Sequence, residues 1–254
     1  MGAGSFVIRE GAGPVIATAI HAGHGLRDEC AQLMALDDAG RLREEDPFTQ
    51  LIAAVAPTQI VATQSRFQVD LNRKREAAVY LQPADAWGLD VWHTPPPAPV
   101  IAASLAEYDA FYAALERVAR AKVAEFGAVV VLDVHSYNHR RGETRAAADV
   151  AGNPEINVGT KSANRARWGN LIERFLRELS ETGTFDVREN VKFTGGAMAQ
   201  WINATFPQTG IALALEYKKT FMDEWTGVAD VPHLERLARA LAATLPGLVE
   251  ELGR

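Results

Sequence analysis

Short apolar runs alternate along the chain with stretches that repeat apolar residues at helical spacing. Four of these runs predict strands, and they are nearly continuous rather than alternating, which is typical of strands covered on both faces. They span residues 15–20, 59–63, 128–134 and 211–217. Such strands separated by helices predict an α/β fold with a mixed, mostly parallel sheet.

Helix signals fill the intervals between the strands. Ser104 and Glu107 have the spacing of a capping box and predict a helix that begins there and runs to about residue 126. Residues 163–179 predict a second helix, with apolar side chains on one face. Residues 197–203 predict a short helix after a pair of glycines.

The C-terminal stretch predicts a final helix that begins near Asp230 and carries leucines on one face. Pro246 is expected to kink or split it, because proline has no backbone N–H to donate. Residues 82–99 and 139–164 lack periodicity and are expected to be long loops, which in compact domains are usually functional or mobile. We expect one domain over residues 1–254, a three-layer arrangement in which helices flank the sheet.

Composition narrows the class of protein. The 254 residues are 48% hydrophobic and 23% charged, with a net charge of −6, which disfavours a nucleic-acid-binding face. The single cysteine, Cys30, excludes an internal disulfide and a zinc site made of cysteines alone. No stretch reaches the roughly 18 apolar residues of a membrane span, and the N-terminus lacks a signal-peptide pattern. We therefore expect a soluble, cytoplasmic protein with neither nucleic-acid nor membrane partners.

Polar residues follow three of the predicted strands. His21 and His135 come after the first and third strands, and Glu216 lies at the end of the fourth. If these strands are parallel neighbours, their carboxyl ends bring the three residues to one crevice. Two imidazoles and a carboxylate are the ligands of a catalytic zinc site, and Glu45 and Asp46 are candidates for the carboxylate. The alternative is that both histidines are buried side chains with ordinary hydrogen bonds.

A second group of polar residues lies at positions 65–73. Arg66 and Arg73 flank Asp70 and Asn72 there. The planar guanidinium group matches a carboxylate through two hydrogen bonds, and asparagine adds a further donor. Asp70 can orient one of the arginines. This pattern indicates an anion site, and the alternative is a surface strand with an Arg–Asp pair.

These motifs together resemble the N-formylglutamate amidohydrolase family, whose core fold is similar to that of the zinc carboxypeptidases and the aspartoacylase group. The resemblance covers most of the chain and includes Gly195-Gly196 and Met222-Asp223-Glu224 besides the residues above. It implies a zinc-carboxypeptidase-like fold and a zinc-dependent hydrolase that cleaves the amide bond of a small N-acyl amino acid. The first candidate substrate is N-formyl-L-glutamate, which would yield glutamate and formate.

The resemblance also implies a metal site. His21, Asp46 and His135 resemble the family's ligands for one Zn²⁺ per chain, although another divalent metal would fit the same donors. The carboxypeptidase-like relatives have a metal glutamate three residues after the first histidine, where this chain has His24. His24 and Glu45 are therefore further candidates for ligands or for neighbours that hydrogen-bond near the metal.

Roles for the remaining residues follow from the same resemblance. Glu216 resembles the general base, and Arg66 an arginine that polarises the scissile carbonyl. Asn72 and Arg73 resemble the pair that holds the substrate carboxylate. Asp133 lies two residues before the second metal histidine, on the same face of the strand, where it can orient that ligand or make a structural hydrogen bond.

Alternatives to this function remain open at the level of the sequence. One is a carboxypeptidase-like or other N-acyl amino acid deacylase, and another is a non-catalytic protein that binds a metal or an anion. The candidate base Glu216 beside the ligands disfavours the second. Four further cations can meet a second substrate carboxylate or lie in solvent, and these are Arg140, Arg141, Lys218 and Lys219. Gly195 and Gly196 can let a loop approach the ligand closely.

Overall fold

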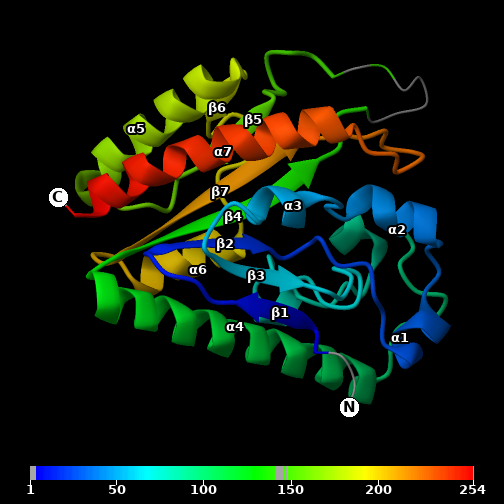
Figure 1. Cartoon of the computed structure of the whole chain (residues 1–254). Coiled ribbons are helices and arrows are strands. Elements are labelled where there is room, and N and C mark those ends of the chain that lie inside the picture. The colour runs from blue at the N-terminus through cyan, green and yellow to red at the C-terminus, as the bar shows by residue number, and fades with distance from the viewer. Residues whose placement is uncertain (1–3, 141–145, 147, 254) are drawn as a thin grey trace.

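In the computed structural model, which describes residues 4–140, 146 and 148–253, seven strands form one sheet (Figure 1). The strands are β1 (Phe6–Arg9), β2 (Val15–Ala19), β3 (Thr58–Ala62), β4 (Val129–Tyr137), β5 (Ile156–Gly159), β6 (Val187–Glu189) and β7 (Gly210–Lys218). Their order in the sheet is β1-β3-β2-β4-β7-β5-β6. The central strands β3, β2, β4 and β7 are parallel, whereas β1 and β5 run antiparallel to β3 and β7. The predicted mixed, mostly parallel sheet is confirmed.

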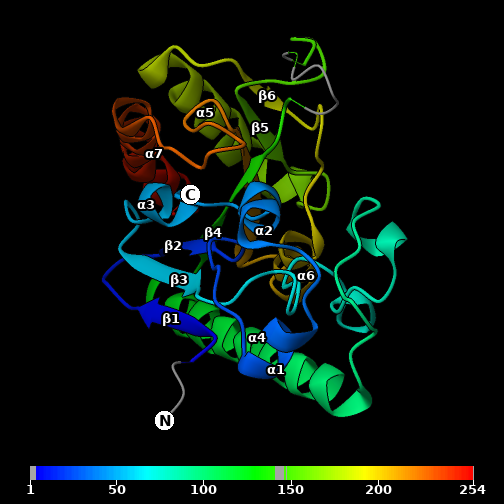
Figure 2. The ribbon, with the colours of Figure 1, turned by 90° about the vertical axis from the view of Figure 1, so that its right-hand side faces the viewer.

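Helices cover both faces of this sheet and give the expected three layers (Figures 1 and 2). On one face lie α4 (Ala98–Phe126) and α6 (Ala197–Thr205), and on the other lie α3 (Thr49–Ala53), α5 (Arg165–Gly183) and α7 (Val231–Leu252). Two short helices, α1 (Asp28–Leu33) and α2 (Asp38–Glu44), follow β2. Among the described residues, none of the helices is both long and apolar enough to cross a membrane.

The continuous apolar run of β4 reflects two separate cores. Val130, Leu132 and Val134 pack in the core beneath α5 and α7. Val129 and Val131 pack in the core beneath α4 and α6. Because successive side chains of a strand point to opposite faces, a strand between two helical layers needs apolar residues at every position.

The expected capping box at the start of the long helix is wrong. Helix α4 begins at Ala98, and Pro99 is tolerated in its first turn because the N–H groups there have no partner within the helix. Ser104 is buried inside the helix and accepts a hydrogen bond of 2.9 Å from Arg27 Nη2. Arg27 Nη1 donates to Glu107 at 2.6 Å. The Ser–Glu spacing thus serves a contact with the chain before α1.

Pro246 does not split the last helix, which continues from Val231 to Leu252. The apolar stripe explains this, because Leu237 and Leu241 before the proline and Leu248 after it are buried in the same core. Packing of both halves against the sheet outweighs the hydrogen bond that proline cannot make.

The two expected loops contain regular structure that was too short to produce a pattern. Residues 139–164 include the buried strand β5, which is hydrogen-bonded to β7, while residues 141–145 and 147 lie outside the described residues. Residues 82–99 include a 3₁₀ turn at Pro83–Ala86 and the first residues of α4. Strands of three or four residues, such as β6 and β1, are not recognisable from periodicity.

Candidate active site

The carboxyl ends of β2, β4 and β7 meet at one place in the sheet, since the three strands are adjacent and parallel. His21 follows β2, and His135 in β4 is the register partner of Glu216 in β7. Asp133 and His135 continue the row of β4 side chains that faces α4 and α6. His21, His135 and Glu216 line one cleft of about 590 Å³. The condition of parallel neighbours is therefore met.

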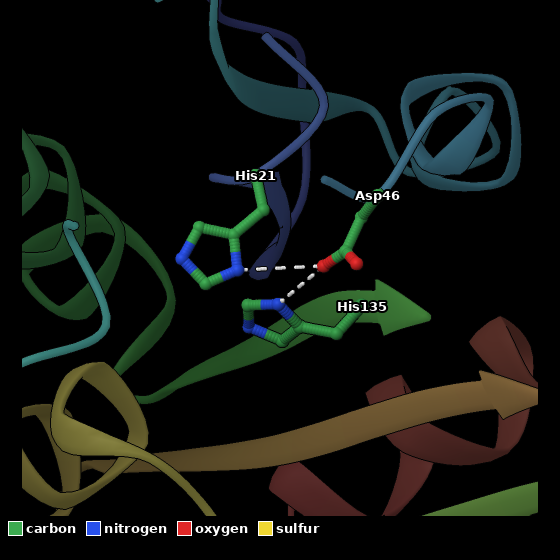
Figure 3. Close-up of side chains that lie close together, drawn as sticks. All are labelled: His21, Asp46 and His135. Atoms are coloured by element: carbon green, nitrogen blue, oxygen red, sulfur yellow. Dashed lines mark hydrogen bonds and ion pairs between the residues drawn. The ribbon is translucent and has the colours of Figure 1, made fainter. Parts of the chain in front are cut away.

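Two imidazole rings and one carboxylate converge at the floor of this cleft (Figure 3). Asp46 Oδ2 lies 3.0 Å from His135 Nδ1 and 3.4 Å from His21 Nδ1. One ligand atom from each of the three residues lies within 4.8 Å of the others, and all three side chains are buried. Asp46 is held by its backbone N–H, which donates to His21 O at 2.9 Å, and by Ser136 Oγ, which donates to Oδ1 at 3.2 Å.

The outer nitrogen of each ring contacts a second buried carboxylate. His21 Nε2 lies 2.7 Å from Asp70 Oδ1, and His135 Nε2 lies 2.9 Å from Asp133 Oδ1. A carboxylate at Nε2 favours the tautomer with the proton on that nitrogen and leaves the Nδ1 lone pair free. Asp133 thus lies where it can orient His135, and Asp70 does the same for His21.

The donor set fits a zinc ion. His21 Nδ1 is buried and has no hydrogen-bond partner among the described residues, which is a costly arrangement unless another group uses its lone pair. Two imidazole nitrogens and one carboxylate oxygen, with space on the cleft side, are the ligands of an open catalytic zinc site. A cation at this point would contact His21, Asp46 and His135.

The electrostatics of the group favour positive charge. Burial opposes ionisation of Asp46, yet the adjacent imidazoles of His135 and His21 hold the pKa of its carboxyl well below the ordinary range. Burial would also lower the pKa of His135, but Asp133 and Asp46 raise it well above 6.5. Desolvation raises the pKa of Glu216 to about 8. The two rings are surrounded by these carboxylates, which is the setting that a divalent cation requires.

The wall of the cleft is built around Asp70, whose carboxylate is fully buried. Arg66 Nη2 donates to Asp70 Oδ2 at 2.8 Å, and the hydroxyl of Tyr80 donates to the same oxygen. The Arg66 guanidinium also lies over the ring of Trp87, 4.9 Å from its centroid. Asp70 therefore orients one arginine and one histidine of the site at once.

The side chain of Asn72 fills the space that a side chain at residue 196 would need, and residue 196 is a glycine. Its backbone N–H donates to Asp70 Oδ1 at 2.8 Å, and its Oδ1 accepts from Met198 N at 3.1 Å. Its Nδ2 lies 3.3 Å from His135 Nε2. A Cβ atom at Gly196 would lie 2.3 Å from the Asn72 amide, so Gly196 makes room for this side chain.

Arg66 and Arg73 both line the cleft, and Arg73 is the more exposed of the two. Its side chain is 43% exposed, with Nε 3.7 Å from Asp70 Oδ2 and Nη2 3.4 Å from the carbonyl of Asp85. It follows Asn72 directly in the chain, and both residues line the cleft. An exposed guanidinium with long contacts is available for an anionic ligand.

The structure does not bring His24 and Glu45 into the metal group. His24 Nδ1 lies 2.6 Å from Glu45 Oε2, and Ser65 Oγ donates to the other oxygen of Glu45. Neither residue lines the cleft, which Glu44 does instead. Glu45 uses its side chain to fix the backbone beside Asp46.

The sequence left two places open for Lys219, contact with a substrate carboxylate or solvent. The side chain is 2% exposed and lines the cleft, so it does not lie in solvent. Its position directly after the strand that carries Glu216 is the signal for this burial. Lys218 Nζ donates to Asn153 O at 3.1 Å, Arg140 is exposed, and Arg141 lies outside the described residues.

Comparisons with known proteins show the family and the fold of the chain. The model of a family described as N-formylglutamate amidohydrolase matches residues 13–222. The fold is similar to that of N-formylglutamate amidohydrolase from Ralstonia eutropha JMP134, with a TM-score of 0.80 and 17% identity over 98% of this chain and 99% of that one. It is also similar to gene product Atu2144 from Agrobacterium tumefaciens, with a TM-score of 0.68 and 17% identity over 98% and 95% of the two chains. A comparison with curated proteins gave no match.

Proposed function

The chain belongs to the N-formylglutamate amidohydrolase family, and we propose from this premise that it is a zinc-dependent enzyme whose substrate is N-formyl-L-glutamate. The resemblance predicted from the motifs is confirmed, and with it an activity on amide bonds. The zinc ion and the substrate are the proposal. The observation that carries it is the convergence of His21, Asp46 and His135 beside Glu216.

The zinc ion would be held by Nδ1 of His21, Oδ2 of Asp46 and Nδ1 of His135. When bound, zinc acts as a Lewis acid toward a carbonyl oxygen and lowers the pKa of water to about 7. Asp70 and Asp133 accept hydrogen bonds from the Nε2–H groups, so that both Nδ1 lone pairs point into the cleft. Loss of such outer partners typically weakens metal binding by about 10- to 100-fold.

Glu216 is the proposed general base. Its carboxylate takes a proton from the water molecule whose oxygen attacks the formyl carbon. The same proton then passes to the amide nitrogen as the C–N bond breaks, and formate and the free amino group of glutamate are the products. A desolvated carboxyl group with its pKa raised to about 8 can both accept and return a proton near neutral pH.

Three side chains would bind and orient the substrate. Arg66 is fixed by Asp70 and faces the negative charge that develops on the carbonyl oxygen. Asn72 and Arg73 hold the α-carboxylate and so set its distance from the metal. Lys192 also lines the cleft, and this further cationic side chain favours a substrate with two carboxylates.

Purified protein tests the proposal in two measurements. Metal analysis should find about one zinc per chain, as expected for a catalytic site of this kind. A panel of N-formyl, N-acetyl and N-succinyl amino acids should give the highest kcat/KM for N-formyl-L-glutamate. A different acyl group at the top of the panel would assign another deacylase activity. Stoichiometric zinc without turnover of any substrate would contradict an enzymatic role.

A further inference from the structure

Lys219 is a buried lysine with two hydrogen bonds to backbone carbonyls. Its Nζ donates to Arg43 O at 2.6 Å and to Glu45 O at 2.7 Å. The side chain is 2% exposed. Burial of an ammonium group is expensive, and an apolar side chain would stabilise the fold more cheaply. A role beyond packing is therefore expected for Lys219.

Both carbonyls lie at the C-terminal end of α2, directly before Asp46, since Arg43 is in the last turn of the helix and Glu45 is its C-terminal cap. Asp46 itself follows in an irregular segment, so no strand or helix ladder fixes its backbone. Lys219 reaches it from the opposite side, since its own N–H donates to Tyr137 O at the end of β4, at 3.0 Å. The side chain thus spans from the strands that carry His135 and Glu216 to the residue immediately before Asp46.

The other contacts around Asp46 come from parts of the chain other than β7. The backbone N–H of Asp46 is tied to His21, and the carboxylate of Glu45 is tied to His24 and Ser65. His21, His24 and Ser65 lie after β2 and β3. Ser136 of β4 donates to Asp46 Oδ1, and Thr49 of α3 donates to Asp46 O. The ammonium group of Lys219 supplies the hydrogen bonds from the β7 side.

From this geometry we infer that Lys219 is a positioning residue that holds the Asp46 carboxylate at the point where the two Nδ1 atoms converge. It acts through the carbonyls of Arg43 and Glu45 and does not itself bind the metal. The inference rests on the proposed zinc site.

Zinc affinity, measured by competition with a chromophoric chelator, tests the inference without reference to activity. In Lys219→Met, which keeps the apolar stem and removes the ammonium group, the dissociation constant of zinc should rise about 10- to 100-fold. Lys122→Met is the matched control, because Lys122 is also buried and also donates to a backbone carbonyl, that of Gly11, away from the cleft. The control should leave zinc affinity within about twofold of the parent value.

A double-mutant cycle separates positioning from general destabilisation. If Lys219 acts through Asp46, then Lys219→Met should weaken zinc binding much less in an Asp46→Ala background than in the parent protein. Equal losses in both backgrounds would overturn the inference, and so would an unchanged affinity in Lys219→Met alone. If Lys219→Met does not fold, Lys219→Gln, which is too short to reach both carbonyls, takes its place with the same expectations. Failure of the parent protein to bind zinc would instead refute the proposed function.

Discussion

His135 and Glu216 are direct partners across the parallel strands β4 and β7. A proposed metal ligand and the proposed base are therefore fixed relative to each other by backbone hydrogen bonds of the central sheet. Asp46 belongs to an irregular segment instead and is held by isolated contacts, its own N–H to His21 O and Ser136 Oγ to its carboxylate. The sheet supplies the rigid half of the site, and the loops supply the half that can be perturbed separately.

Glu216→Gln should slow turnover and, above about pH 8, stabilise the metal-free protein. The folded state raises the pKa of this carboxyl from 4.5 to about 8, so it favours the protonated form. The contribution of Glu216 to stability is complete below about pH 4.5 and is lost as the pH rises toward 8. Glutamine cannot ionise, and the free energy of unfolding at pH 9 should therefore increase by about 1–3 kcal/mol. Thermal melts at pH 5 and pH 9 in the presence of a chelator measure this effect.

The same variant tests the role of Glu216 as the base. We expect kcat to fall by about 10²- to 10⁴-fold while zinc content is unchanged. Activity close to that of the parent enzyme would exclude this role. A loss of zinc along with activity would place Glu216 among the ligands.

His21→Ala and His135→Ala should each remove zinc from the purified protein. Both rings contribute Nδ1 to the same point, and a single imidazole with one carboxylate binds zinc weakly. Chelation should also lower the Tm of the parent protein, since a ligand at 100 times its Kd stabilises the folded state by about 2.7 kcal/mol. His93→Ala, at an exposed histidine outside the cleft, is the control and should retain zinc. Stoichiometric zinc in both site variants would reject the ligand assignment.

Arg73→Ala should raise KM about 10- to 100-fold, as expected for one charge-assisted hydrogen-bonded contact to a carboxylate. The effect should disappear with a substrate whose α-carboxylate is converted to an amide. Arg75→Ala serves for comparison, because Arg75 pairs with Asp109 at the surface and does not line the cleft. Equal kinetic constants in both variants would remove Arg73 from the substrate-binding group.

Gly196→Ala should impair catalysis with little effect on folding. The added methyl group would lie 2.3 Å from the Asn72 amide and displace it from its position next to His135. We expect kcat/KM to fall by about 10²-fold, comparable with the cost of a misplaced positioning group. Gly169→Ala in α5 is the matched control, since a Cβ there meets no described atom within 4 Å. It should leave activity unchanged and add up to about 1 kcal/mol of stability.

Sequence patterns were informative where one physical requirement dominates. Strands between two helical layers must be apolar throughout, so β2, β3, β4 and β7 were predicted within a few residues. His21, His135 and Glu216 interrupt the ends of these runs, and parallel topology then brings them together. The same reasoning could not decide which of Glu45 and Asp46 lies beside the histidines, because both follow α2 in an irregular segment.

The errors have a common origin in long-range contacts. Ser104 and Glu107 have the spacing of a helix cap, yet both bind Arg27, which is distant in sequence. Lysine is usually a surface residue, and the buried ammonium group of Lys219 is satisfied by the carbonyls of Arg43 and Glu45. Such partners follow from tertiary structure, which local propensity does not encode.

The two-sided packing of β4 has a consequence for how the site tolerates change in chain length. Deleting one residue between Val130 and Asp133 would turn every later side chain of β4 to the opposite face of the sheet. The imidazole of His135 would then enter the apolar layer beneath α5 and α7, Ser136 would take its place at the cleft, and Val134 would take the place of Asp133. Insertions and deletions that preserve the enzyme are thus confined to the connections between strands, where no parity of positions has to be kept.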